Sequence, residues 1–376
     1  MAGIYIHIPF CKQACHYCDF HFSTNTSRKT EMVQAIIREL QLQKDYLGGE
    51  LVNTIYFGGG TPSLLSASEL SQLLKSLDQL FPITDKAEIT LEANPDDLNA
   101  DKLKILKTAG INRLSIGIQS FHEPHLKFLN RAHNANEASN CVQFAQDVGF
   151  DNISIDLIYA IPAKDHAIWE SDLAKAIALQ VQHISSYCLT IEEKTVFGNW
   201  LRKGKLKEVE DNYAAEQFEM LLSTLKTNGY EQYEISNFCL PDFYSRHNSN
   251  YWRKEPYLGV GPGAHSYNGQ HRQFNISNNN LYLKALTEEK IPAEQDILAL
   301  HDQINEYIMT GLRTKWGCDL RKIKEEYKYD LYQENKIYLD QLLADGKILM
   351  QDQYLILTDS GKLLADRIAS DLFIVR

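Results

Sequence analysis

Short runs of β-branched and other apolar residues alternate with longer amphipathic stretches over the first two thirds of the chain. Apolar runs of about four to eight residues are typical of buried strands, whereas longer stretches with apolar residues three or four positions apart are typical of helices. Strands are predicted at residues 4–8, 54–57, 88–91, 113–118, 152–158, 183–188 and 230–235. Helices are predicted at residues 28–46, 66–80, 135–148, 165–179 and 212–227. This order predicts an α/β fold with at least six βα units and a parallel sheet.

The pattern changes beyond about residue 268, where a polar segment (274–280) is followed by mainly helical periodicity. Near the end, a predicted helix (337–343), a hairpin (346–357) and a helix from Ser360 follow one another in the order of a winged-helix module. We therefore expect a barrel domain at 1–267, a connector at 268–297 and a small, mainly helical domain at 298–376. The mixed local charge of the last domain favours a protein partner or a cover for a substrate over DNA.

Polar and glycine residues follow or end the first four predicted strands, and Asp156 lies within the fifth. In strand order they are Cys11, Cys15 and Cys18, the turn Gly58-Gly-Gly-Thr-Pro62, Glu92, Gln119 and Asp156. The carboxyl ends of parallel strands share one edge of a sheet or barrel, and loops at that edge build ligand sites. The sequence therefore predicts that these residues form one ligand site at a single rim of the sheet or barrel.

The three cysteines Cys11, Cys15 and Cys18 are spaced CxxxCxxC on one short loop, which can present three thiolates to one point. Thiolates are the usual ligands of iron–sulfur clusters, and an open coordination position is where a metal site performs chemistry. One alternative is a structural zinc site with His16 or His21 as the fourth ligand. Another is a buried helix face of small apolar residues, which the preceding proline and the aromatic-rich 17–22 segment disfavour.

The glycine-rich turn at 58–62 places residues without side chains where backbone can approach a ligand closely. The alternative is a tight strand-to-helix turn in which Ser63 or Ser66 caps the next helix. The sequence leaves both interpretations open.

A second polar and aromatic cluster spans residues 245–252, Ser-Arg-His-Asn-Ser-Asn-Tyr-Trp. His247 is a candidate axial ligand of haem iron, with Tyr251 and Trp252 covering the macrocycle, because neutral imidazole commonly ligates haem. The alternative is that His247 and Asn248 form hydrogen bonds within a buried loop while the aromatic residues fill the core.

The chain has 376 residues, of which 44% are hydrophobic and 23% are charged, as in soluble globular proteins. No apolar run approaches the ~20 residues that span a bilayer, so we expect no integral membrane protein. The formal net charge of -11 argues against non-specific binding of nucleic acid. The seven cysteines form no disulfide framework, and no secretory signal precedes the first strand, so we expect a reducing, cytoplasmic location.

The CxxxCxxC spacing, with Tyr17 before the last cysteine, resembles the radical S-adenosylmethionine (SAM) superfamily. Together with Asp19-Phe20, the Gly-Gly-Gly-Thr-Pro turn and the His-Asn-x-x-Tyr-Trp run at 247–252, it resembles the haem chaperone HemW family over nearly the whole chain. The resemblance implies a partial (β/α)6 TIM-like barrel with a winged-helix-like C-terminal domain. It also implies three ligands for a [4Fe-4S] cluster, namely Cys11, Cys15 and Cys18, with SAM on the open iron.

The same resemblance assigns further residues to each cofactor, and it assigns no catalytic residue. The residues implied for SAM are Gly59, Gly60, Thr61, Glu92, Gln119, Arg131 and Asp156, with Tyr5 and Tyr17 against the cluster or adenine. The residues implied for haem are His247, Asn248, Tyr251 and Trp252.

A relative, the oxygen-independent coproporphyrinogen III oxidase, carries a further cysteine two residues after the third cluster ligand and lacks the His-Asn-x-x-Tyr-Trp run. Here that position is Phe20. The resemblance therefore implies a haem chaperone that delivers haem to a respiratory acceptor, which places its work at the periphery of the membrane. The alternative is a radical enzyme that abstracts hydrogen from a porphyrinogen propionate, and a third interpretation is a zinc protein with an interaction module. The sequence leaves open whether the chain forms a homodimer.

Overall fold

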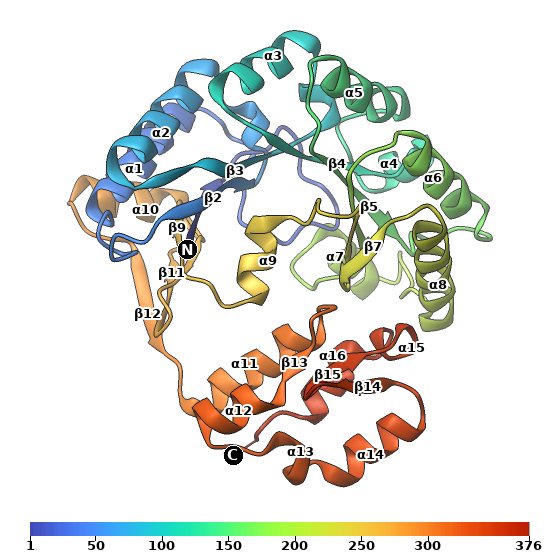
Figure 1. The fold of residues 1–376 in the computed structure, drawn as a ribbon. Helices are drawn as coiled ribbons and strands as arrows, with labels where there is room; N and C mark the ends of the chain where they lie inside the picture. The colour runs from blue at the N-terminus through green and yellow to red at the C-terminus, as the bar shows by residue number, and fades with distance from the viewer. Residues whose placement is uncertain (376) are drawn as a thin grey trace.

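One large, mainly parallel sheet forms the frame of the protein in the computed structural model, which describes residues 1–375 (Figure 1). Its strands are β1 (Ala2–Ile8), β2 (Val52–Gly59), β3 (Ile83–Ala93), β4 (Arg113–Gln119), β5 (Ile153–Tyr159), β6 (His183–Cys188), β7 (Glu231–Glu234), β8 (Asn237–Cys239), β9 (Tyr257–Val260), β10 (His265–Tyr267), β11 (His271–Asn275) and β12 (Ala293–Ile297). The order across this 12-stranded sheet is β12-β11-β10-β9-β1-β2-β3-β4-β5-β6-β8-β7. Strands β9 and β1 to β6 are parallel, and antiparallel strands flank them at both edges. The six predicted parallel strands are confirmed, and the curved sheet is the expected partial barrel.

Helices cover the outside of this sheet (Figure 1). They are α1 (Lys29–Leu42), α2 (Ala67–Leu80), α3 (Ala100–Ala109), α4 (Glu123–Phe128), α5 (Ala135–Asp147), α6 (Ala167–Ala178), α7 (Val196–Arg202), α8 (Asp211–Thr227) and α10 (Asn279–Thr287), with 3-10 turns η1 (Pro62–Leu64) and η2 (Pro95–Asp97). α2 begins at a capping box of Ser66 and Glu69 and buries a stripe of leucines against the sheet. The short helix α9 (Arg246–Trp252) differs, because it packs against β1 and β2 of the barrel.

Two segments join the sheet in a different way from the predicted one. The predicted strand at 230–235 is β7, which pairs antiparallel with β8 at the edge of the sheet and does not join the parallel barrel. The connection from β7 to β8 is a tight hairpin, which forces antiparallel pairing. The segment predicted as a connector, 268–297, contains β11 and β12, which extend the same sheet. β12 is largely exposed, so it lacks the apolar alternation that marks a half-buried strand.

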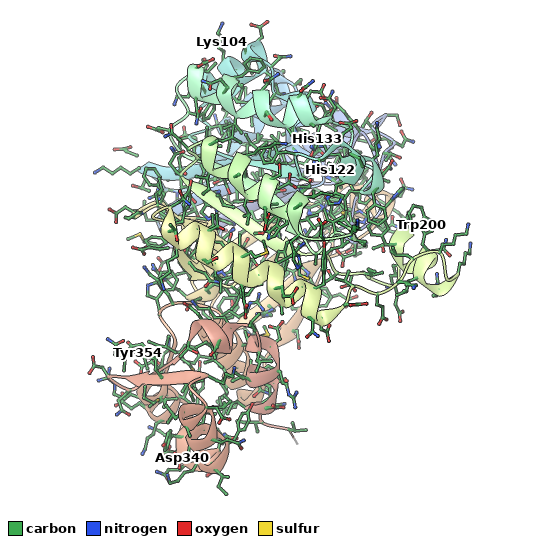
Figure 2. All side chains as sticks on the ribbon, turned by 90° about the vertical axis from the view of Figure 1, so that its right-hand side faces the viewer. Lys104, His122, His133, Trp200, Asp340 and Tyr354 are labelled. Carbon is green, nitrogen blue, oxygen red and sulfur yellow. The ribbon has the colours of Figure 1, made fainter. Side chains whose placement is uncertain are left out.

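The C-terminal domain lies below the barrel, where Asp340 and Tyr354 mark it in Figure 2. Its elements are α11 (Leu300–Leu312), β13 (Cys318–Asp319), α12 (Leu320–Tyr327), α13 (Leu331–Glu334), α14 (Lys336–Ala344), β14 (Ile348–Gln351), β15 (Tyr354–Leu357), α15 (Asp359–Lys362) and α16 (Ala365–Asp371). The order β13-β15-β14 forms a small antiparallel sheet, and the domain buries a hydrophobic core of its own. The predicted succession of helix, hairpin and helix is confirmed. Within residues 1–375 no helix combines the length and apolarity needed to cross a membrane.

Glu39 of α1 is fully buried and ties this helix to the last strands of the sheet. One of its carboxylate oxygens accepts hydrogen bonds from Gln43 (2.8 Å) and Asn275 (2.7 Å). The other accepts from the Gly261 amide (2.8 Å) and the Tyr282 hydroxyl. We expect Glu39→Gln to lower the free energy of unfolding by about 2–4 kcal/mol, because the new amide group must face two donors.

Urea unfolding checks this prediction against Glu31→Gln, which changes an exposed carboxylate on the same helix. That control loses only a surface ion pair, so its free energy of unfolding should change by less than about 1 kcal/mol. Equal stability of the two variants would show that the hydrogen bonds to Glu39 do not hold α1 in place.

Candidate cluster and cofactor site

The loop after β1 places Cys11, Cys15 and Cys18 at the carboxyl end of the barrel strands. The three thiols are free and partly exposed, and they line one cavity of about 470 Å³. Burial raises the pKa of Cys11 and raises that of Cys18 to about 12, so a bound cation is needed to favour the thiolates at neutral pH. An iron cluster supplies such charge.

Hydrogen bonds fix the backbone of this loop at both ends and in the middle. The Cys11 amide donates to the Ser23 carbonyl at 3.0 Å, and the His16 amide donates to the Leu129 carbonyl at 3.1 Å. Asn130 donates to the Ala14 carbonyl at 2.7 Å. The cysteines are therefore held by the segment after α4, which continues directly into Arg131.

Arg131 connects the cysteine loop to β4 through contacts of its guanidinium group. One guanidinium nitrogen lies 3.4 Å from Cys15 Sγ and 3.3 Å from the Tyr17 hydroxyl. The other donates to Asn94 Oδ1 and to the Gly117 carbonyl, both at 2.7 Å. Both terminal nitrogens of Arg131 are therefore engaged by protein groups. The buried Nε has no partner among the described residues, and Arg131 lies on the cavity wall.

The glycine turn after β2 packs directly beneath the cysteine loop. The Gly60 amide donates to the Ile8 carbonyl at 2.9 Å, and the Thr61 amide donates to the Phe10 carbonyl at 2.7 Å. A Cβ atom at Gly60 would lie 2.6 Å from the Phe10 carbonyl oxygen and 2.8 Å from that of Ile8. Gly59 has a φ of 104°, in the left-handed region that favours glycine. Close backbone contact, as well as access for a ligand, explains this motif.

We expect Gly60→Ala to displace the cysteine loop and reduce the iron bound after reconstitution to less than about half, because the added methyl meets only backbone atoms. Gly110→Ala is the matched control. Its φ of 103° makes alanine costly by about 1 kcal/mol, but no atom lies within 4 Å of the new Cβ. The control should therefore lose stability and keep its iron, as measured by iron analysis and thermal unfolding. Full iron content in Gly60→Ala would refute the proposed contact.

Two partly buried carboxyl groups face the same cavity from β3 and β5, the strands on either side of β4. Glu92 accepts hydrogen bonds from the Tyr56 hydroxyl (2.8 Å) and the Gly59 amide (3.2 Å), and burial raises its pKa to about 7. Burial likewise raises the pKa of Asp156 to about 6. Gln119 reaches the cavity from a strained backbone with a φ of 67°. Such carboxyl and amide groups are suited to ribose hydroxyls and to an ammonium group.

The structure brings together every residue predicted for the cluster and for SAM except one. Those lining the cavity are Cys11, Cys15, Tyr17, Cys18, Gly59, Gly60, Thr61, Glu92, Gln119, Arg131 and Asp156. Tyr5 does not line it, because its side chain points into the barrel, where the hydroxyl pairs with His7 Nδ1 at 3.2 Å. Asn94, Ser115 and Gly117 also line the cavity and were missed. The alternation of side chains along β4 puts Ser115 and Gly117 on the same face as Gln119, which is a usable signal.

His247 lies inside the barrel at the amino end of the strands, far from this rim. It is 1% exposed, and its ring nitrogens pair with the Thr54 hydroxyl at 2.9 Å and the Tyr251 hydroxyl at 2.7 Å. Thr54 precedes Gly59 by five residues on β2, which corresponds to about 16 Å along the strand. The 247–252 run and the cysteines thus lie at opposite ends of the barrel.

The short helix α9 explains the residues of the 247–252 run. The Glu88 carboxylate accepts hydrogen bonds from the amides of Arg246 (3.3 Å) and His247 (3.1 Å), and Ser245 caps the Asn248 amide at 3.4 Å. Because both ring nitrogens of His247 are used, this geometry does not offer an axial ligand to haem. The alternative, in which His247 forms hydrogen bonds within a buried segment, describes this run better.

Burial lowers the pKa of His247 to about 3, below its usual value near 6.5. The unfolded chain binds the proton more tightly, so His247 makes the folded state lose stability as pH falls from about 6.5 towards 3. His247→Gln removes this titration. We expect it to destabilise the protein at pH 7.5, with a deficit that shrinks steadily towards pH 5. Urea unfolding at several pH values measures the difference in free energy of unfolding between the variant and the unmodified chain. The contributions of the other titrating groups cancel in this difference. A difference that does not change with pH would contradict the assignment.

The candidate fourth ligands of the zinc alternative have other partners. His16 Nδ1 pairs with the Phe128 carbonyl at 2.9 Å, and its ring packs 4.8 Å from that of Trp200. Trp200 belongs to the segment around α7, which projects from the barrel in Figure 2. His21 Nε2 pairs with Asn279 at 2.8 Å. Among the described residues no three His, Cys, Asp or Glu side chains converge on a single ion; a cubane does not require this, because each thiolate binds a different iron.

A partial barrel with CxxxCxxC at its rim defines a radical SAM protein, and residues 5–172 match the sequence model of the radical SAM superfamily. The chain is 36% identical over 371 residues to the heme chaperone HemW of Bacillus subtilis, which covers 98% of each protein. It is 41% identical over 267 residues to the heme chaperone HemW of Escherichia coli, covering 70% of this chain and 69% of the relative. The chain belongs to the HemW family.

The fold also matches the solved structure of coproporphyrinogen III oxidase (HemN) from Escherichia coli, a radical SAM enzyme. The TM-score is 0.86 at 23% sequence identity, and the match covers 99% of this chain and 90% of the oxidase. This likeness concerns the fold alone. Phe20, at the position where the oxidase family carries its additional cysteine, lies at the cavity and is 69% exposed.

Proposed function

We propose that this chain is a haem chaperone that carries a [4Fe-4S] cluster and SAM. The single observation that carries the proposal is the convergence of three thiols, a glycine turn and two partly buried carboxyl groups on one cavity in a member of the HemW family. The names of the relatives at 36% and 41% identity supply the haem-carrying role.

The donor set fits the implied cofactors. Cys11, Cys15 and Cys18 would hold three irons, and Arg131 beside Cys15 would offset part of the negative charge of the thiolates. Glu92 and Asp156 would hold the hydroxyl and ammonium groups of SAM. When bound, the cluster supplies an open iron for SAM and a one-electron redox centre.

The alternative function is oxidation of a porphyrinogen, which the fully furnished SAM site supports. Phe20 argues against it, because an exposed aromatic ring cannot replace a thiol as a ligand or hydrogen donor at the mouth of the cavity. We therefore favour haem handling, with a respiratory protein at the membrane periphery as the acceptor and a cytoplasmic location for the chain.

Anaerobic reconstitution with iron and sulfide, followed by titration with SAM and then with haem, tests the proposal. We expect saturable changes in the cluster spectrum with SAM and a saturable Soret band with haem. 5′-Deoxyadenosine, measured by chromatography, should not accumulate in proportion to haem bound. A preparation with intact cluster that binds no haem would refute the chaperone role, and a preparation with zinc and no sulfide would favour the third interpretation.

A further inference from the structure

A second cavity, of about 780 Å³, lies between the barrel and the C-terminal domain. The barrel contributes the ends of β5 and β6 and one face of α8, and the C-terminal domain contributes α15 and α16. Figure 1 shows α8 standing beside these two helices. Its size falls in the range of about 300–1,000 Å³ that is usual for sites that bind cofactors.

This interdomain cleft adjoins the cluster cavity. Tyr187, Cys188 and Thr190, at and after the end of β6, line both spaces. A ligand in the cleft would therefore lie directly beside the SAM and cluster site. His247 lines neither of the two cavities.

Three of the apolar and aromatic side chains that line the cleft are exposed by more than a third of their surface. Tyr187 is 44% exposed, Leu363 is 38% exposed and Leu364 is 39% exposed, while Tyr159 and Phe218 form the floor. Exposed apolar groups that gather in a concave site with a polar rim are typical of binding sites. Three aromatic rings and two leucines suit a broad, flat, apolar ligand.

The rim of the cleft is cationic, although the whole chain has a net charge of -11. The charged residues of the lining are Arg313, Lys347, Lys362 and Arg367 against Asp211 and Asp366. Arg313 is paired with Asp366 (2.6 Å) and Lys362 with Asp359 (2.9 Å). Lys347 has no carboxylate partner among the described residues, and Arg367 has only a distant one, Asp371 at 3.9 Å. Lys347 and Arg367 are thus available to an anionic ligand.

We propose that haem binds in this interdomain cleft, with its ring against Tyr187, Leu363 and Leu364 and its two propionates towards Lys347 and Arg367. The inference rests on the proposed chaperone function and places the haem between the two domains, away from His247. A ligand with an apolar, flat body and two carboxylates matches the two properties of the cleft, namely an exposed apolar wall and unpaired cations. The C-terminal domain then acts as one wall of the haem site.

Haem and haem dimethyl ester, titrated into the full-length reconstituted protein, test the cleft by their Soret bands. We expect the protein to prefer haem over the ester, which lacks carboxylates, by about tenfold. Lys347→Glu combined with Arg367→Glu should weaken haem binding by about tenfold or more and remove the preference. Ala215→Trp, which fills the cleft from α8, should weaken the binding of both probes.

The control for charge is Lys324→Glu combined with Lys336→Glu, two exposed lysines of the same domain outside the cleft. This control and His247→Gln should bind haem within about twofold of the unmodified chain, a difference of less than about 0.5 kcal/mol. Haem affinity that is unchanged in the cleft variants, or that is lost only in His247→Gln, would overturn the inference. The proposed chaperone function would not be affected by either result. Failure of the unmodified chain to bind haem would overturn both.

Discussion

The triple variant Cys11→Ala, Cys15→Ala, Cys18→Ala should retain almost no iron or sulfide after anaerobic reconstitution, whereas the unmodified chain should bind about four of each. The three cysteines of the loop line one cavity, and thiolates are the usual ligands of an iron–sulfur cluster, which alanine cannot replace. Iron and sulfide analysis, together with the visible absorption of the iron–sulfur cluster, measures the loss.

The buried cysteines provide the matched control for this prediction. Cys141 of α5, Cys239 of β8 and Cys318 of β13 are buried in the hydrophobic cores or beside them. The triple variant Cys141→Ala, Cys239→Ala, Cys318→Ala should lose stability, because each substitution leaves a small void. It should still assemble its cluster. Retention of a complete cluster by the loop variant would show that the cysteine loop is not the cluster site.

The second large effect concerns SAM. We expect Asp156→Asn to weaken SAM binding to the reconstituted protein by roughly 10–100-fold, the cost of about 1.5–3 kcal/mol for a lost charge-assisted hydrogen bond. The carboxylate faces the cavity, and its protein hydrogen bonds are to the hydroxyl groups of Ser115, at 3.4 Å, and Ser185. Because a hydroxyl group can also pair with an amide, the change should leave the fold and the iron content intact.

Asp151→Asn is the control for this change, because Asp151 is exposed just before the other end of the same strand. Equilibrium dialysis of SAM should show no change for this control. Identical SAM affinity in Asp156→Asn and Asp151→Asn would remove Asp156 from the site.

The sequence predicted the rim of the barrel well because the physics there is simple. Parallel strands end on the same side, so Glu92, Gln119 and Asp156 were expected to meet the cysteines, and they line one cavity. Tyr5 does not line this cavity, because its side chain lies deeper in the barrel, where the hydroxyl pairs with His7 Nδ1. The role of a residue beside a motif depends on this alternation and on the loop that follows.

The placement of the 247–252 run could not be predicted from its residues. A histidine flanked by aromatic side chains suits a haem site and a hydrogen-bonded core equally well. What decides between them is where the chain returns after β8, and it enters the amino end of the barrel, where Glu88 and Thr54 meet α9. β9 was missed for a related reason, because a strand of four residues that contains Gly259 has little hydrophobic signal of its own.

The most direct test of haem handling, as opposed to porphyrinogen oxidation, is one anaerobic incubation of the reconstituted protein with coproporphyrinogen III, SAM and a reductant. The products are measured by chromatography after oxidation to porphyrins. We expect coproporphyrinogen III to be recovered unchanged after incubation with a preparation that binds haem. Formation of protoporphyrinogen IX over many turnovers would contradict it and assign the chain to the oxidases.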